Sequence, residues 1–406
     1  MYQQLDRLDF QDPFSVQVLA PEGAGPGAQE GSSAADDWYL PAYVNIEYHH
    51  PDGGGHIKSL DFHNCSFVSI PDSVWGLPSL EKVEIHAMED LISLTTVTSK
   101  DNTTTTTTTT LQKCKLKELI VDECYSLDKL PPLPDSLTHI SIKACHRMTF
   151  LPKSIVEATN LKVLQISNMM LPMGPSLPST LEELKINGSE IQIRKLKMYL
   201  AGDGCGAMKN LKSLRLSMCD LNNEHLKAIW REILPICPQL QRLNLSGNNI
   251  RSLSSLVVVK TTPRTTKKSP TRTTRTRLRS LNLEGNPVVN KHNDNNNNTN
   301  EESNHLLTIL EQNPELCCLG GDINWKLPLY QNHSAALQKA LDDNFARILK
   351  ASSSSCPLAL WSNVLQCAAA NTNSVKNNNV EDHLAASLIY NVLQGPAFVE
   401  RLPHTY

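Results

Sequence analysis

The sequence is poor in aromatic residues, carries little net charge and contains no long hydrophobic run. Phe, Trp and Tyr make up 5% of the 406 residues, which is low for a globular core built around rings. The 38 basic and 41 acidic residues leave a formal net charge of −3, so bulk electrostatics favour neither nucleic acid nor an anionic membrane as a partner. No stretch reaches the roughly 18 apolar residues of a transmembrane helix, and the first residues are polar. We therefore expect neither a membrane span nor a secretory signal.

The sequence also lacks the short motifs that carry catalysis. It contains no phosphate-binding loop of the form GxxxxGK[ST], no GxSxG nucleophile elbow and no HExxH zinc motif. Residues 202–206 are rich in glycine but lack the strand-to-helix context of a phosphate loop. His49, His50 and His56 flank a glycine turn, where solvated histidines are a simpler interpretation than a metal site. We therefore expect no enzyme, no cofactor, and no catalytic or metal-binding residue.

One hydrophobic pattern recurs along the chain instead. Its clearest copy is the segment LQRLNLSGNNI at residues 240–250, with leucines spaced as LxxLxL and an asparagine three positions after the last leucine. A single unit of this kind cannot bury its own apolar face, so neighbouring units must stack on it. The same register begins at Ile57, Leu80, Leu116, Leu137, Leu161, Leu181, Leu211, Leu240 and Leu278.

This repetition predicts an α/β solenoid with a parallel sheet on its concave side. Each unit would contribute one short strand that turns its leucines inward, followed by a return segment. Most units start 20 to 30 residues after the one before, which leaves room for an extended return or, in the longer units, a helix. Residues 222–235 predict such a helix, because Leu226, Ile229, Trp230 and Ile233 share one face and an asparagine can cap it.

Six units carry a cysteine or an asparagine at the same position of the turn after the strand. An asparagine there can hydrogen-bond the backbone of the turn, and a thiol can act as a weak partner and small apolar filler. Because cysteines recur as part of the repeat, we expect the eleven cysteines to be reduced and the protein to be intracellular. The predicted turn ladder consists of Cys65, Cys124, Cys145, Cys219, Asn248 and Asn286.

Composition divides the chain into four parts. We expect a disordered N-terminus at residues 1–36, an N-terminal hairpin cap at 37–56, the solenoid at 57–321 and a C-terminal helical cap at 322–406. Biased tracts rich in Thr, in Thr and basic residues, and in Asn predict disordered inserts near residues 98–112, 258–277 and 290–303. The insert near residues 258–277, which is rich in Thr and basic residues, has four interpretations: a solvated loop, a phosphorylation switch, a nuclear import signal or a patch that binds an acidic partner.

From about residue 57 to about residue 320 the chain resembles the leucine-rich-repeat superfamily. The CxxLxxLP units at residues 124–131 and 145–152 resemble the irregular repeats of plant intracellular immune receptors, although no nucleotide-binding module accompanies them. Residues 133–137 and 177–181 are similar to the short repeats of bacterial effector proteins. The whole arrangement resembles leucine-rich-repeat proteins of diatom-like algae. The resemblance implies protein–protein recognition without catalysis.

The residues that flank the inward leucines would form the surface of the concave face, and we expect the partner to bind there. The first strands carry acidic residues and later strands carry basic ones, which suits a partner with the opposite gradient. The alternative is that these residues only keep the face soluble. The candidate residues are Asp61, His63, Glu84, His86, Ile120, Asp122, Ser141, Lys143, Gln165, Lys185, Arg215, Asn244 and Asn282.

Two functional hypotheses follow from this organisation. The first is a monomeric, non-catalytic scaffold of the cytoplasm or nucleus that binds a protein partner on the concave face. The second is a substrate adaptor of a ubiquitin-ligase complex, whose C-terminal helices would dock the ligase core. In both hypotheses the partner is a protein rather than a nucleic acid or a membrane.

Overall fold

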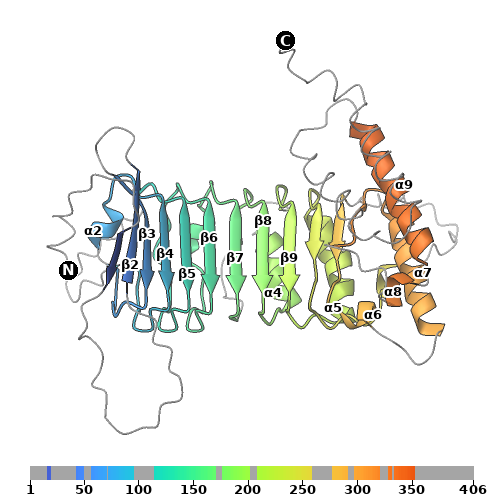
Figure 1. Ribbon diagram of the computed structural model, residues 1–406, viewed down its shortest axis with the longest axis horizontal. Helices are drawn as coiled ribbons and strands as arrows, with labels where there is room; N and C mark the ends of the chain where they lie inside the picture. The colour runs from blue at the N-terminus through green and yellow to red at the C-terminus, as the bar shows by residue number, and fades with distance from the viewer. Residues whose placement is uncertain are drawn as a thin grey trace, which may run out of the picture. The chain divides into compact units, whose positions relative to one another are not determined.

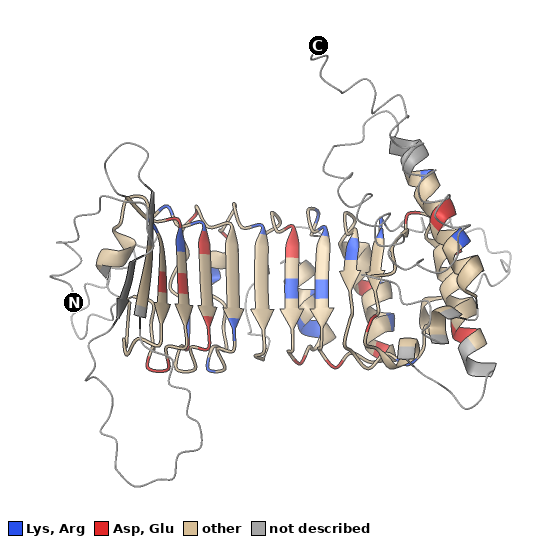
Figure 2. Cartoon of the chain, viewed as in Figure 1, with Lys and Arg blue, Asp and Glu red and all other residues tan. Residues whose placement is uncertain are grey.

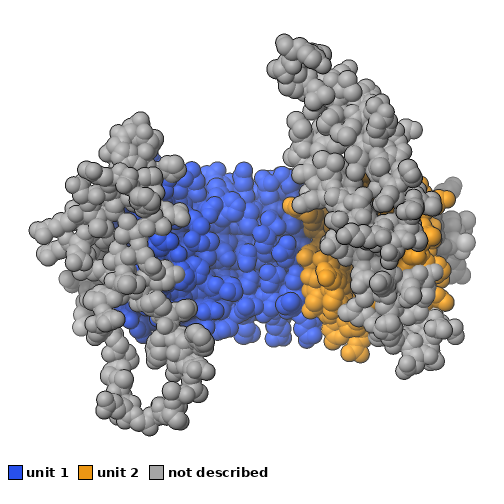
Figure 3. All heavy atoms as spheres, viewed as in Figure 1, with its two compact units in different colours: residues 1–220, 228–240 blue, residues 221–227, 241–406 orange. Residues whose placement is uncertain are grey.

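The computed structural model divides into two compact units (Figure 3). Unit 1 comprises residues 1–220 and 228–240, and unit 2 comprises residues 221–227 and 241–406. The residues that the structure describes are 16–19, 43–49, 56–70, 72–95, 114–170, 176–201, 208–257, 277–290, 297–320, 328–331 and 333–352. The Thr-rich insert predicted at 98–112 and the helices predicted beyond residue 352 lie outside them, as does nearly all of the basic insert.

Unit 1 contains one sheet whose strands follow each other in chain order (Figure 1). The first two pairings are antiparallel, and every later pairing is parallel without a register shift. Six of the repeat units recognised in the sequence thus each contribute one five-residue strand, as the predicted solenoid requires. The strands are β1 (Val16–Leu19), β2 (Tyr43–His49), β3 (His56–His63), β4 (Lys82–His86), β5 (Glu118–Asp122), β6 (His139–Lys143), β7 (Val163–Ser167), β8 (Glu183–Asn187) and β9 (Ser213–Ser217).

The N-terminal end of this sheet corrects one expectation. Strand β2 pairs with β3 as an antiparallel hairpin, in agreement with the alternating pattern of residues 43–48. The segment predicted to lack structure, residues 1–36, nevertheless supplies β1, which pairs antiparallel with β2. A short strand among Pro, Gly and Ala residues has little local signal, because its stability comes from the hydrogen bonds of the edge that it covers.

The repeat strands form because their apolar residues occupy every second position. In β4, for example, Val83 and Ile85 are fully buried, while the alternating residues Lys82, Glu84 and His86 remain half-buried on the other face. Strands β5, β6 and β8 repeat this alternation, so aliphatic side chains stack strand upon strand. Each fully buried Val, Leu or Ile contributes about 1.5–3 kcal/mol relative to an exposed one, which makes this stack the main stabilising element of unit 1.

In unit 1, each repeat strand from β3 to β9 is followed by a residue in the left-handed backbone region. These residues have φ between 48° and 57°, and most of them are not glycine. The left-handed turn aims the backbone N–H at the last carbonyl of the next strand, with N···O distances of 2.8–3.0 Å in six consecutive turns. This bond extends the ladder by one residue beyond the strands and fixes the direction of the return segment. The residues are Asn64, Ala87, Glu123, Ala144, Asn168, Gly188 and Met218.

The turn conformation predicts a stabilising substitution at Glu123, which is exposed and has φ 56°. A non-glycine residue in this region is strained by about 1–2 kcal/mol, whereas glycine adopts it freely. We expect Glu123→Gly to raise the free energy of unfolding by about 1 kcal/mol relative to Glu123→Ala, measured by urea denaturation. The alanine variant removes the same carboxylate but keeps the strain, so equal stabilities of the two variants would contradict this reading.

The return segments of unit 1 change from loops to helices along the chain. In the described residues of the early ones the helical turns are short, α2 (Asp72–Trp75) and η1 (Lys153–Ile155), whereas the later α4 (Ile193–Ala201) is a longer helix. The helix predicted over residues 222–235 is present as three consecutive segments, α5 (Asn223–Ala228), η2 (Ile229–Ile233) and η3 (Leu234–Ile236). Asn222 caps the first of them, since its Oδ1 accepts hydrogen bonds from the N–H groups of Glu224 and His225, both at 3.1 Å.

Unit 2 has two parallel strands and the two longest helices of the described residues. Strand β10 (Arg242–Asn244) pairs with β11 (Ser280–Asn282). After β11, a single parallel bridge joins Ser280 to Cys318. The helices are η4 (Ser254–Leu256), α6 (Pro287–Asn290), α7 (Asn297–Gln312), α8 (Pro328–Gln331) and α9 (Ser334–Ser352). Helix α7 corrects the disordered insert predicted at 290–303, because residues 297–303 are helical and Ser303 is fully buried.

Helix α9 is the longest described helix of the segment predicted to form the C-terminal cap. It contacts α7 and α8, and it buries Leu337 and Leu341. Asn344, which is 3% exposed, donates hydrogen bonds from Nδ2 to the carbonyl oxygens of Leu310 at 3.1 Å and Leu316 at 2.9 Å. The Leu310 carbonyl lies in the last turn of α7, where the helix itself supplies no donor. One side chain of α9 therefore satisfies the end of another helix.

Candidate interaction face and its polar network

The polar residues between the buried aliphatic ones share one face of the sheet, which we call the open sheet face. Strand register places seven of the predicted partner-binding residues in one row across this face. Their side chains alternate with the core positions, so the row lies opposite the buried stack. In order from β3 to β9 the central row consists of Asp61, Glu84, Ile120, Ser141, Gln165, Lys185 and Arg215.

Charge is separated along the central row (Figure 2). Acidic residues occupy β3 and β4, and basic residues occupy β8 and β9, with uncharged residues between them. Glu84 and Lys185 are partly neutralised on their own strands, by Lys82 at 3.0 Å and by Glu183 at 3.5 Å. Arg215 is exposed and makes no ion pair with any residue that the structure describes. The basic end of the row therefore carries a cation that is available to a partner.

A second row runs beside the first and holds the remaining predicted residues of unit 1. It places His63, His86, Asp122 and Lys143 side by side on β3 to β6. Lys143 Nζ lies 2.6 Å from Asp122 Oδ2, and this hydrogen bond raises the pKa of Lys143. Asp122 Oδ2 in turn lies 3.9 Å from His86 Nδ1. The four residues form a continuous polar network with Asp61.

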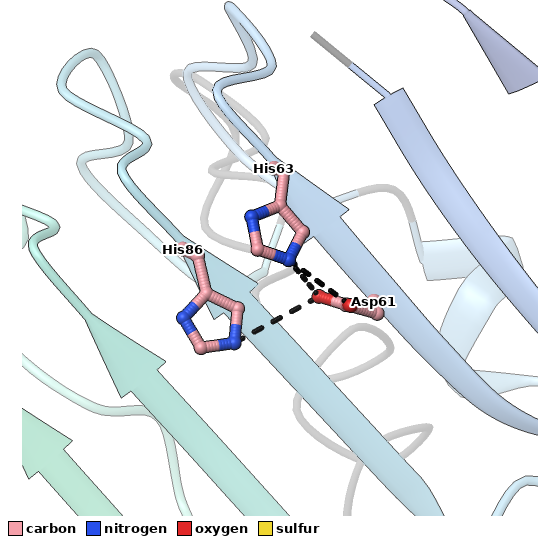
Figure 4. A group of neighbouring side chains, drawn as sticks. All are labelled: Asp61, His63 and His86. Atoms are coloured by element: carbon pink, nitrogen blue, oxygen red, sulfur yellow. Dashed lines mark hydrogen bonds and ion pairs between the residues drawn. The ribbon is translucent and has the colours of Figure 1, made fainter. Parts of the chain in front are cut away.

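The closest cluster in this network contains Asp61, His63 and His86 (Figure 4). His63 Nε2 lies 2.9 Å from Asp61 Oδ1, and His86 Nε2 lies 3.8 Å from the same oxygen. The two imidazole rings stack with centroids 4.5 Å apart. The sequence placed all three residues on the binding face but gave no reason to group them. The histidines that it considered together do not join this cluster: His49 and His56 pair at the other end of β3, and His50 lies outside the described residues.

The turn ladder predicted from the sequence lies inside the fold rather than on the open sheet face. Asn248 Nδ2 donates to the carbonyl of Leu245 at 2.8 Å, and its Oδ1 accepts from the N–H of Leu221 at 3.1 Å. Asn286 is fully buried and makes the equivalent hydrogen bonds in the next repeat, from its Nδ2 to the carbonyl of Leu283 and from the N–H of Ile250 to its Oδ1. The thiols at this position donate to the carbonyl two residues before them: Cys65 at 3.2 Å, Cys124 at 3.5 Å, Cys145 at 3.3 Å and Cys219 at 3.1 Å.

Burial and hydrogen bonds shift the pKa values of the ladder cysteines in different directions. Burial raises the pKa of Cys65 and of Cys219 to about 11. The hydrogen bond with Cys145, together with burial, raises the pKa of Cys124. The same hydrogen bond lowers the pKa of Cys145. All eight cysteines among the described residues are free thiols. Because the thiolate is the reactive form, the raised pKa values make the thiols of Cys65, Cys124 and Cys219 less reactive than exposed ones.

Two of the predicted binding residues belong to unit 2, where their side chains accept hydrogen bonds from nearby backbone N–H groups. Asn244 Oδ1 accepts a hydrogen bond from the N–H of Ser246 at 2.9 Å, and Asn282 Oδ1 accepts from the N–H of Glu284 at 2.8 Å. They are register partners on β10 and β11. Asparagine side chains often bond the backbone two residues later in this way, so part of their polar surface is already used.

Sequence reasoning missed a set of exposed apolar side chains beside the strands. Their positions fall in turns and return segments, where the repeat pattern gives no information about exposure. Tyr125 stacks on His146 with ring centroids 5.8 Å apart. The exposed apolar residues of the described segments are Val68, Ile92, Tyr125, Phe150, Val156, Met170, Met198 and Met218.

The strand ladder, the turn ladder and the helical end define the class: the chain folds as a leucine-rich-repeat solenoid. The Leucine Rich Repeat family model matches residues 239–258. Among solved structures, the chain is similar to a leucine-rich-repeat protein of Leptospira interrogans, at 14% identity over 64% of this chain and 82% of that chain, with a TM-score of 0.18. No curated protein matches the chain. No helix of the described segments has both the length and the apolar character needed to span a membrane.

Proposed function

We propose that the chain is a non-catalytic protein-interaction scaffold whose partner binds the open sheet face of unit 1. The separation of charge along the central row carries this proposal. A face that only had to remain soluble would not need acidic residues on β3 and β4 and basic residues on β8 and β9. A protein partner with the opposite order of charges would be attracted and oriented by this gradient.

The face also offers the regular geometry that an extended or flat partner needs. Neighbouring strands stand about 4.8 Å apart, so the row from Asp61 to Arg215 extends over roughly 30 Å. The side chains along it are mostly short or held by neighbours on the same strand, which limits the entropy lost on binding. Such a length fits a protein surface or an extended peptide better than a small molecule.

Charge reversal at the basic end tests the proposal. We expect the double variant Lys185→Glu and Arg215→Glu to weaken partner binding at least about tenfold, because attraction becomes repulsion at two positions of the interface. The partner would be captured by proximity labelling in the source cell, and its binding to the purified chain would then be measured by titration.

A matched control keeps the net charge of that variant while leaving the face intact. Lys129 and Lys209 are exposed residues outside the strands, and Lys129→Glu with Lys209→Glu changes the charge by the same amount. The control should bind the partner as the wild type does. If both double variants bind equally well, the open sheet face is not the interface.

The ubiquitin-ligase adaptor remains an alternative prediction. It requires C-terminal helices that dock a partner, yet the one described in full, α9, uses Leu337, Leu341 and Asn344 to pack on unit 2. These contacts favour a capping role for α9. A cytoplasmic or nuclear location and a kinship with the irregular repeats of plant and algal proteins are likewise part of this proposal, and they rest on the sequence alone.

A further inference from the structure

We propose that Asp61, His63 and His86 bind a divalent transition-metal ion of the zinc class. The ligands would be one carboxylate oxygen and the two imidazole Nε2 atoms. The site lies at the acidic end of the open sheet face, so Asp61 takes part in both proposals, but metal binding needs no second protein and does not involve Lys185 or Arg215.

The strand register brings the three ligands together. His63 and His86 are direct partners on the parallel strands β3 and β4, and Asp61 stands two residues before His63 on the same face. Both Nε2 atoms point toward the Asp61 carboxylate (Figure 4). The three ligand atoms lie within 4.8 Å of one another.

The distances match what a small divalent ion requires. Tetrahedral zinc with bonds of about 2.0–2.1 Å places its ligand atoms roughly 3.3 Å apart. The two histidine-to-carboxylate distances, 2.9 Å and 3.8 Å, lie on either side of that value. Small rotations of the imidazole rings, which lie near the surface, would equalise them.

The electrostatic surroundings favour a cation between these groups. Among the described residues, only histidines lie within ion-pair distance of Asp61, whereas Glu84 and Asp122 each have a lysine. Asp61 Oδ1 is shielded from solvent, and its nearest polar partners in the described part of the chain are the two imidazole Nε2 atoms. A metal ion bound between these three groups would compensate the negative charge of the carboxylate.

A second carboxylate lies where metal-binding histidines usually have one. Asp122 Oδ2 is 3.9 Å from His86 Nδ1, the nitrogen that would not bind the metal. A carboxylate hydrogen-bonded to that nitrogen would hold the proton on Nδ1 and orient the ring, and a small rotation of His86 would bring Asp122 within hydrogen-bond distance. Lys143 anchors Asp122 from the other side at 2.6 Å. The cluster thus has an outer layer as well as its three ligands.

The ligand types select the ion. Two imidazoles and one carboxylate suit zinc and neighbouring transition metals, whereas magnesium and calcium prefer oxygen ligands alone. Three protein ligands leave a fourth position of zinc to water. The site would therefore hold zinc in an open arrangement rather than a closed structural one.

Metal titration of the full-length chain tests this proposal. The untagged protein would be stripped with a chelator, dialysed, and titrated with Zn²⁺ by calorimetry, with Co²⁺ absorption as a report on coordination. We expect one site per chain that is lost or weakened at least about tenfold in Asp61→Asn, His63→Ala and His86→Ala. Mg²⁺ should not compete.

The control is His139→Ala, which removes a histidine from β6 on the same face but away from the cluster. It should bind zinc as the wild type does. Circular dichroism would verify folding, and the nearly isosteric Asp61→Asn provides a folded variant if a histidine variant unfolds. Equal zinc binding by wild type, Asp61→Asn and His86→Ala would overturn the proposal, as would the absence of binding to the wild type.

Discussion

Replacing Trp75 with alanine is expected to lower the free energy of unfolding of unit 1 by about 3–5 kcal/mol. Trp75 ends the short helix α2 and is 1% exposed. Its indole Nε1 donates a hydrogen bond to the carbonyl of Leu94 at 2.8 Å. The substitution removes the largest buried ring of the return segments and leaves that carbonyl without this donor, in a place that water does not reach. Urea denaturation followed by circular dichroism would measure the loss.

Two further variants separate the ring from its hydrogen bond. Trp75→Phe keeps an aromatic ring but no donor, and should cost about 1–3 kcal/mol. Phe150 is 59% exposed, so Phe150→Ala should change the stability by less than about 0.5 kcal/mol. A loss at Trp75 no larger than the loss at Phe150 would show that α2 does not contribute to the core.

Replacing Asn286 with alanine is expected to destabilise unit 2 by about 3 kcal/mol. Its Oδ1 accepts from the N–H of Ile250 at 3.1 Å, and its Nδ2 donates to the carbonyls of Leu245 and Leu283, both at 2.8 Å. The two carbonyls keep a second donor each, but the buried N–H of Ile250 loses its acceptor. An orphaned buried amide accounts for most of the expected effect.

Asn249 provides the matched control in the neighbouring turn. Its side chain accepts a hydrogen bond from Arg251 at 3.2 Å at the surface. Asn249→Ala should therefore be nearly neutral by the same urea titration, within about 0.5 kcal/mol. Hydrogen exchange would add a local test, because the amide of Ile250 should lose protection in Asn286→Ala and retain it in Asn249→Ala.

The strand positions were predictable because their signal is local. An LxxLxL segment indicates which side chains face inward, because shifting the strand register by one residue would turn all of these leucines toward solvent. The same register then places Asp61, Lys185 and Arg215 on the opposite face without further information. The turn residues were predictable for the same reason, since Cys124 and Asn248 stand at a constant distance from the leucines.

Other features depend on contacts between distant residues and carry no periodic signal. Strand β1 comes from a segment whose composition indicates disorder, and it is ordered by the edge of β2. The residues of α7 from Asn297 to Ser303 read as an asparagine-rich loop, yet Ser303 donates a hydrogen bond to the carbonyl of Leu329 at 2.7 Å. In both cases tertiary contacts override a weak local preference.

The cluster of Asp61, His63 and His86 shows the same division within one site. The sequence determined that each side chain faces out of the sheet, because each alternates with a buried aliphatic residue. Only the tertiary structure decided that His86 lies beside His63, 23 positions earlier in the chain. Alternation along a strand depends only on residues that are neighbours in the sequence. The approach of side chains from two strands depends instead on the register in which separate repeats stack and on the rotamers that neighbouring side chains allow.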